Sequence, residues 1–310
     1  MMIQAVLTTL YQVFIPLSIP VIAGWLLQKY QKLDTKPFIS LALYILSPAL
    51  IFDVLTKSHV ATDDTVLTLA FCIINLLFLW MAANVWGRLL KMSSADLAGL
   101  TLISSFTNSV NYGFPLVLLA LGQSGMDYAS VYVIIQMIIV NIMGVYFAAR
   151  SHFSIKQAIK SVFRLPAIYA AIAAFLVQMF DFQVPTGIDK GISLLSGAYS
   201  PLVLCILGAQ MASVQKVGLA RNQLKAFWSG LSMRLLIAPL IAYFILGFLD
   251  IKGTQFLVLF ILASMPVAVN AVVLAEKFDA SPKIVSKCIL WTTLASFIVL
   301  PILITISGRG

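Results

Sequence analysis

The sequence of 310 residues is short of charge and of cysteine. Charged residues make up 10% and hydrophobic residues 61%, with a mean hydropathy of +1.01, whereas soluble domains carry about 25% charged and about 45–50% apolar residues. This deficit excludes a soluble globular protein and indicates a polytopic membrane protein with little or no soluble domain. The three cysteines lie inside apolar segments, so neither a disulfide framework nor a cysteine metal site is expected.

The chain also lacks the side chains that a membrane enzyme needs. Its only two histidines, His59 and His152, lie in connecting loops, and no paired aspartates lie inside an apolar segment. Since such chemistry requires a nucleophile with a base or a set of metal ligands, an enzyme is not expected. No basic residue precedes Lys29, so the first apolar segment is not a cleavable signal peptide and is expected to be retained.

Long apolar runs predict ten transmembrane helices, because about 20 apolar residues of helix span a bilayer. Their expected ranges are 5–27, 38–55, 66–90, 97–121, 128–149, 165–181, 188–212, 226–249, 253–275 and 286–307. The loops between them are short, and Asp181 closes the sixth helix early. The fold class is therefore all-α, with the helices themselves making up nearly the whole protein.

Basic residues are divided unequally between the two sets of alternate loops. One set carries fifteen Lys and Arg residues and the other carries three. Because basic loops stay in the cytoplasm, both termini are expected outside the cell membrane and the 150–164 loop inside. The net charge of +9 therefore reflects the basic residues of the cytoplasmic loops and does not indicate a nucleic-acid partner.

Proline motifs recur along the chain at a nearly constant spacing. The matching pairs are Ile15-Pro16 with Leu165-Pro166, Ser47-Pro48 with Ser200-Pro201, and Pro115 with Pro266, at offsets of 150, 153 and 151 residues. Five helices per repeat is an odd number, so the second copy enters the membrane from the opposite side. The sequence predicts two inverted five-helix repeats, residues 1–149 and 150–310, whose broken helices meet near the midplane.

The stretch from Asn108 to Pro115 places amides and helix breakers in the middle of an apolar segment. Asn108 and Asn111 share a helical face, Tyr112 follows them, and Gly113 permits unusual backbone angles or close approach. Pro115 removes the N–H that would bond residue 111, and a half-helix starting near it would present free N–H groups suited to a carboxylate. We predict a substrate site here; a proline kink with amides that tie helices together is the alternative.

The ninth helix carries a second polar stretch. Pro266 is expected to break this helix as Pro115 breaks the fourth, and Ser264 and Asn270 either complete the pocket or make interhelical hydrogen bonds. At an offset of 151 residues, Asn108 and Asn111 map onto leucines. One asymmetric pocket is therefore expected in place of two equivalent sites.

Four further polar residues at depth are candidates for an ion site or a counter-charge. Arg234 in the eighth helix could balance an anion or snorkel to headgroups. Asp53, near the outer end of the second helix, could bind a cation or proton or lie at the interface. Gln136 and Asn141 on the fifth helix could serve an ion site or hold helices together.

These features together resemble the auxin efflux carrier family, whose members include the plant PIN-FORMED transporters and bacterial permeases for malate and malonate. The resemblance covers essentially the whole chain and is carried by the motifs Ser47-Pro-Ala-Leu-Ile-Phe52 and Asn108-x-x-Asn111-x-Gly-x-Pro115. It implies the fold of the bile acid/sodium symporters, with helices 4 and 9 crossing in a moving transport domain (helices 3–5 and 8–10) beside a scaffold (helices 1, 2, 6 and 7). The short 150–164 connector, in place of the long loop of plant members, suggests a compact prokaryotic member.

The expected function is secondary transport of a small organic anion, such as malate, malonate or an auxin-like acid, by elevator-like alternating access. No cofactor or metal is expected; Na⁺, H⁺ or no ion at all could drive transport. Beyond the substrate, the expected partners are the lipid bilayer and a second copy in a homodimer, the latter by analogy only. A ligand sensor or regulatory membrane protein built on the same fold is the alternative.

Overall fold

The computed structural model describes residues 2–58, 60–149, 163–214, 219 and 223–307. Within these ranges the regular structure is helical, without strands, apart from a single bridge between Thr107 and Val267. Seven helices of the described chain are long and apolar enough to cross a membrane. The prediction of an all-helical, multi-spanning protein is confirmed. The connector at 150–162, where we placed the boundary between the repeats and a cytoplasmic loop, lies outside the described residues.

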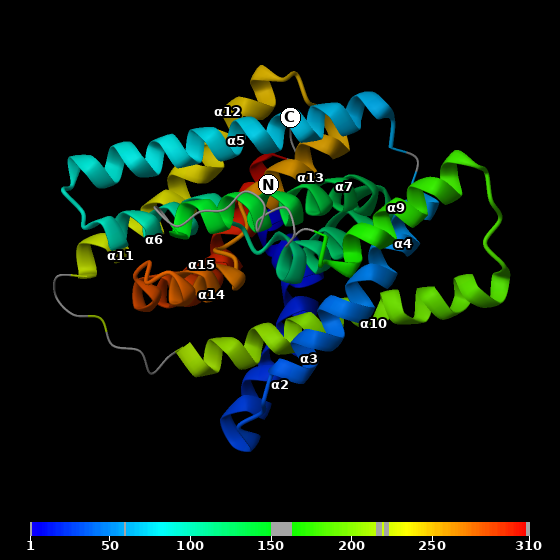
Figure 1. Cartoon of the computed structure of the whole chain (residues 1–310), viewed down its shortest axis with the longest axis horizontal. Helices are drawn as coiled ribbons and strands as arrows, with labels where there is room; N and C mark the ends of the chain where they lie inside the picture. Colours follow the sequence, from blue (N-terminus) through cyan, green and yellow to red (C-terminus); the bar gives the residue numbers. More distant parts are fainter. Residues whose placement is uncertain (1, 59, 150–162, 215–218, 220–222, 308–310) are drawn as a thin grey trace.

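The helices follow one another with few irregular residues between them (Figure 1), and η marks short turns of π-helix. The first half of the chain forms α1 (Met2–Thr9), η1 (Leu10–Phe14), α2 (Ile15–Gln31), α3 (Lys36–Leu41), η2 (Ala42–Leu46), α4 (Ser47–Lys57), α5 (Thr62–Leu89), α6 (Ser94–Ser105), η3 (Ser109–Gly113) and α7 (Phe114–Ala149). The second half forms α9 (Pro166–Met179), α10 (Thr186–Val214), α11 (Leu224–Ser232), η5 (Met233–Ile237), α12 (Ala238–Phe248), α13 (Gly253–Ala263), α14 (Asn270–Lys277) and α15 (Pro282–Ser307).

Each of these four π-helical turns ends two residues before a proline. The prolines are Pro16, Pro48, Pro115 and Pro239. A proline has no N–H to donate, and its ring collides with the carbonyl four residues earlier. A widened turn before the proline removes this collision, so the helix continues through it. Our expectation that a half-helix starts near Pro115 is therefore wrong: the helix starts at Ser109 and runs through the proline.

The long element α7 turns at Gly122. A straight helix of its 36 residues would be about 54 Å long, which exceeds the roughly 30 Å of a bilayer core. Gly122 has φ 64° and ψ −152°, and glycine adopts this left-handed φ without steric penalty. The element therefore consists of two helical segments, as the predicted ranges 97–121 and 128–149 require.

The helices fall into two groups by their contacts. Helices α2, α4, α9 and α10 pack on one another, and α5, α6, α7 and α11 to α15 form a second group. In Figure 1, α2, α3 and α10 lie at the bottom of the view and α5 and α12 at the top. Contacts of α7 with α4, α9 and α10, and of η3 with α10, join the two groups.

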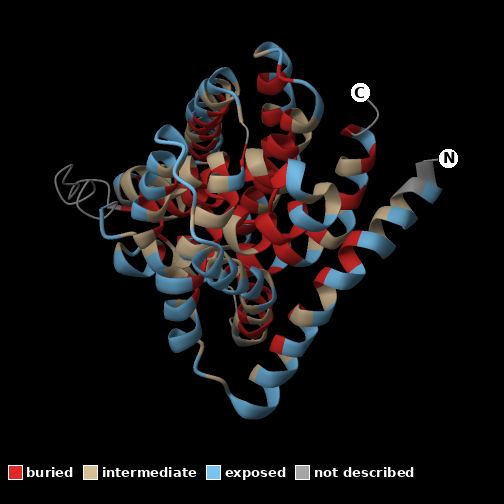
Figure 2. Cartoon of the chain, turned by 90° about the vertical axis from the view of Figure 1, so that its right-hand side faces the viewer, coloured by how far each residue is buried: buried red, intermediate tan, exposed pale blue. Residues whose placement is uncertain are grey.

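Large apolar side chains face outward on the described surface. Phe248 is 84% exposed, Leu194 79% and Tyr11 72%. Figure 2 shows exposed positions along the outer faces of the helices and buried ones in the centre. Apolar surface on this scale marks contact with a partner or a membrane. Here the outward-facing apolar side chains contact the lipid tails of the bilayer.

Candidate substrate site at the paired helix breaks

Two helices are interrupted side by side. Residues 106–108 separate α6 from η3, and residues 264–269 separate α13 from α14. These segments pair antiparallel. The N–H of Asn108 donates to the Pro266 carbonyl at 2.8 Å, and the N–H of Ala268 donates to the Phe106 carbonyl at 2.9 Å. The pairing satisfies backbone groups that would otherwise be bare in an apolar interior.

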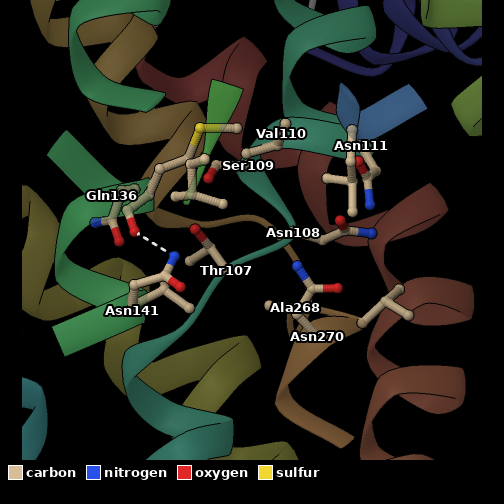
Figure 3. A pocket seen from close by; sticks show the side chains of 14 residues that line it. Thr107, Asn108, Ser109, Val110, Asn111, Gln136, Asn141, Ala268 and Asn270 are labelled. Atoms are coloured by element: carbon tan, nitrogen blue, oxygen red, sulfur yellow. Dashed lines mark hydrogen bonds between the residues drawn. The ribbon is translucent and has the colours of Figure 1, made fainter. Parts of the chain in front are cut away.

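A cavity of about 90 Å³ lies beside the paired breaks (Figure 3). One water needs roughly 10–15 Å³ of such volume, so the cavity has room for several waters or a small polar group. Side-chain amides from three elements line it, namely Asn108, Asn111, Gln136, Asn141 and Asn270. The fold thus brings together amides that are up to 162 residues apart in the sequence.

Backbone N–H groups add further donors at the same cavity. The first N–H groups of a helix have no partner within it, and within the described chain those of Ser109, Val110 and Asn111 make no bond to a carbonyl. The same holds for Val269 and Asn270 at the start of α14. These five residues line the cavity, so two helix N-termini converge on it, each with about half a positive charge.

Tyr199 connects the site to the other helix group. Its hydroxyl donates to the Asn111 Oδ1 at 3.2 Å from α10, and the side chain is 1% exposed. Tyr199 was not among the site residues predicted from the sequence, and neither were Thr107 and Ser109 on the cavity wall. A signal was present for Tyr199, which stands directly before the Ser200-Pro201 motif of the repeat.

Tyr112 and Gly113 face the helices behind the cavity. The Tyr112 hydroxyl is fully buried and accepts a hydrogen bond from Ser296 Oγ at 3.3 Å. A Cβ on Gly113 would lie 2.6 Å from the side chain of Leu262. Both residues therefore hold the first broken helix closely against α13 and α15.

Pro115, Ser264 and Pro266 also lie off the cavity wall. Pro266 is in the second break, where its carbonyl accepts the Asn108 N–H. Ser264 is 5% exposed, and its hydroxyl has no partner among the described residues. The sequence predicted that these residues bind substrate; this stays a prediction, and none of the three lines the cavity.

Arg234 is fully buried behind the breaks and does not line the cavity. Its Nη1 donates to the Ser104 carbonyl at 2.8 Å, and its Nη2 donates to the Ala263 carbonyl. It does not snorkel to the surface. The guanidinium thus binds the C-terminal ends of α6 and α13.

Asp53 belongs to an ion cluster between α4 and α10, outside the cavity. Its Oδ1 accepts from Lys57 Nζ at 2.5 Å and from Ser193 Oγ at 2.9 Å. Lys57 also pairs with Asp189 at 3.2 Å. These contacts tie the two helices together.

Comparisons with known proteins find similarity to membrane transporters. The family described as membrane transport protein matches residues 6–304. An uncharacterized transporter of Methanothermobacter thermautotrophicus is 29% identical over 257 residues, which cover 82% of this chain and 83% of that protein. An uncharacterized transporter of Methanocaldococcus jannaschii is 25% identical over 272 residues, which cover 84% and 86%. The family resemblance predicted from the motifs is confirmed: the chain belongs to the membrane transport protein family, that of the auxin efflux carriers.

Proposed function

We propose that the protein is a secondary transporter of a small organic anion, with a carboxylate bound at the paired helix breaks. The observation that carries this proposal is the cavity, where two helix N-termini and five side-chain amides converge and none of the described lining residues is acidic. The N-termini contribute about +0.5 charge each, which matches one negative charge. Amide and backbone N–H groups donate to carboxylate oxygens.

The mechanism that we propose is elevator-like alternating access on two inverted five-helix repeats. Cavity residues come from both helix groups: Leu43 and Leu165 adjoin α4 and α9, whereas Asn111 and Asn270 belong to the other group. Sliding of the second group along the first would therefore move the amides relative to a fixed wall. In this proposal α2, α4, α9 and α10 form the scaffold.

The charge distribution suggests how the helices beside the cavity are oriented in the membrane. Helix α14 runs from Asn270 at the cavity to Lys277, which begins one of the lysine-rich loops. By the positive-inside rule this end is cytoplasmic, so we propose that α14 leads from the cavity to the cytoplasmic side of the cell membrane, with both termini outside. A homodimer through the scaffold stays a prediction.

Flux into proteoliposomes tests the function directly. Purified protein would be offered radiolabelled malate, malonate and indole-3-acetate, each with and without a sodium gradient, a proton gradient and an imposed potential. Saturable flux of one anion is expected, and the gradient that it follows identifies the coupling. Ligand-induced thermal stabilisation without flux would favour the sensor alternative. The absence of both flux and stabilisation would refute this substrate class.

Tyr199→Phe should lower flux moderately without loss of folding. The ring keeps its packing, but the Asn111 oxygen loses a donor that orients the amide. A neutral hydrogen bond contributes about 0.5–1.5 kcal/mol, so a decrease of about 2- to 10-fold is expected in the initial uptake rate. Tyr169→Phe is the matched control, because its hydroxyl bonds the Phe163 carbonyl on the exposed side of α9. Equal rates in both variants would contradict a role for Tyr199.

A further inference from the structure

Arg234 is a buried cation without a carboxylate partner in the described chain. Its exposed fraction is 0%, and it takes part in none of the ion pairs between described residues. The π-helical turn η5, which precedes Pro239, carries it into the protein. An ionised group is costly to bury unless compensating charge and hydrogen bonds surround it. The structure must therefore supply negative charge of another kind.

That charge comes from the ends of two helices. The guanidinium donates to the carbonyl of Ser104, next to the last residue of α6, and to the carbonyl of Ala263, the last residue of α13. A helix C-terminus carries about half a negative charge. Two such ends sum to about one charge, which one guanidinium balances. The planar fork of an arginine can hold two acceptors at once, whereas an ammonium is a compact point charge.

Carbonyls at the C-terminal ends of interrupted helices are the groups with which secondary transporters coordinate a coupling cation. We propose that Arg234 is a resident cation that occupies this position permanently, so that the paired helix breaks bind neither sodium nor another metal ion. A metal ion beside the guanidinium would place two positive charges a few ångströms apart in a low-dielectric interior. For the carrier proposed above, on which this consequence rests, transport would then be independent of sodium.

Thermal melting of the purified protein tests the proposal without any transport. Wild type, Arg234→Ala and the control Arg88→Ala would be melted in sodium chloride and in choline chloride at equal ionic strength. Arg88 is the matched control because it is an exposed arginine at the end of α5. Wild type and Arg88→Ala should melt alike in both salts. Arg234→Ala should melt lower by on the order of 10 °C, and methylguanidinium should restore part of the loss in this variant only.

Three results would overturn the proposal. One is stabilisation of wild type by sodium over choline. The others are an Arg234→Ala variant that melts no lower than Arg88→Ala, or one that methylguanidinium fails to restore. If Arg234→Ala yields no folded protein, the Arg234→Lys variant serves as the test. Lysine keeps the charge, so this variant should melt alike in sodium chloride and in choline chloride. Stabilisation of Arg234→Lys by sodium would refute the proposal. Absent flux in proteoliposomes would refute the carrier and leave these melting results standing.

Discussion

Asn111→Ala should lower transport by about 10- to 100-fold and leave folding and membrane insertion intact. The amide lines the cavity from η3, where substrate is proposed to bind. A hydrogen bond to a charged group contributes about 1.5–3 kcal/mol, and about 1.4 kcal/mol corresponds to a factor of ten. The initial uptake rate at low substrate concentration measures the loss, with melting temperature as the check on folding.

Asn84→Ala is the matched control for this substitution. Its Nδ2 donates to the Trp80 carbonyl within α5, and the side chain does not line the cavity. Removing the same amide there should leave uptake at the wild-type rate. Normal uptake by Asn111→Ala, or an equal loss in Asn84→Ala, would show that the site does not lie at the broken helices.

The sequence was sufficient to select the five amides that meet at the cavity. Asn108, Asn111 and Asn270 stand out because amides beside glycine or proline in an apolar run are local features of the sequence. Gln136 and Asn141 stood out in the same way, as polar residues at depth. The structure adds that all five amides share one cavity, which no spacing along the chain specifies.

The alignment of the two breaks could not be predicted from proline spacing. The helices before the breaks end at Ser105 and Ala263, 158 residues apart, whereas Pro115 and Pro266 are 151 apart. The difference arises because Pro266 lies inside its break, while a π-helical turn accommodates Pro115 within a helix. Counted from the ends of the helices before the breaks, Asn111 corresponds to Val269, beside Asn270, and not to a leucine.

The partners of the charged residues were also beyond the sequence. Asp53 contacts Ser193, 140 residues away, and Arg234 contacts Ser104, 130 residues away. An isolated charge in an apolar segment indicates that a partner exists. It does not distinguish a substrate from a neighbouring side chain or a helix end, because these partners come from distant elements.

Gly208→Ala should strongly destabilise the protein. Helices α2 and α10 touch through their backbones: a Cβ on Gly208 would lie 1.9 Å from the Val21 carbonyl oxygen, and one on Gly24 would lie 1.9 Å from that of Cys205. Small residues allow such close approach between membrane helices. A backbone carbonyl cannot rotate aside as a side-chain end can, so the two helices must separate. We expect a loss of about 3 kcal/mol in the free energy of unfolding.

Gly197→Ala, on the same helix, separates this packing effect from helix propensity. A Cβ at Gly197 meets nothing within 4 Å, and alanine favours a helix over glycine by about 1 kcal/mol. Gly197→Ala should therefore melt at or above the wild-type temperature, while Gly208→Ala melts several degrees lower at about 2–4 °C per kcal/mol. Equal melting of the two variants would contradict the close crossing. Because α10 also carries Tyr199, separation of this crossing should lower uptake too, which would identify α2 and α10 as the support against which the broken helices are held.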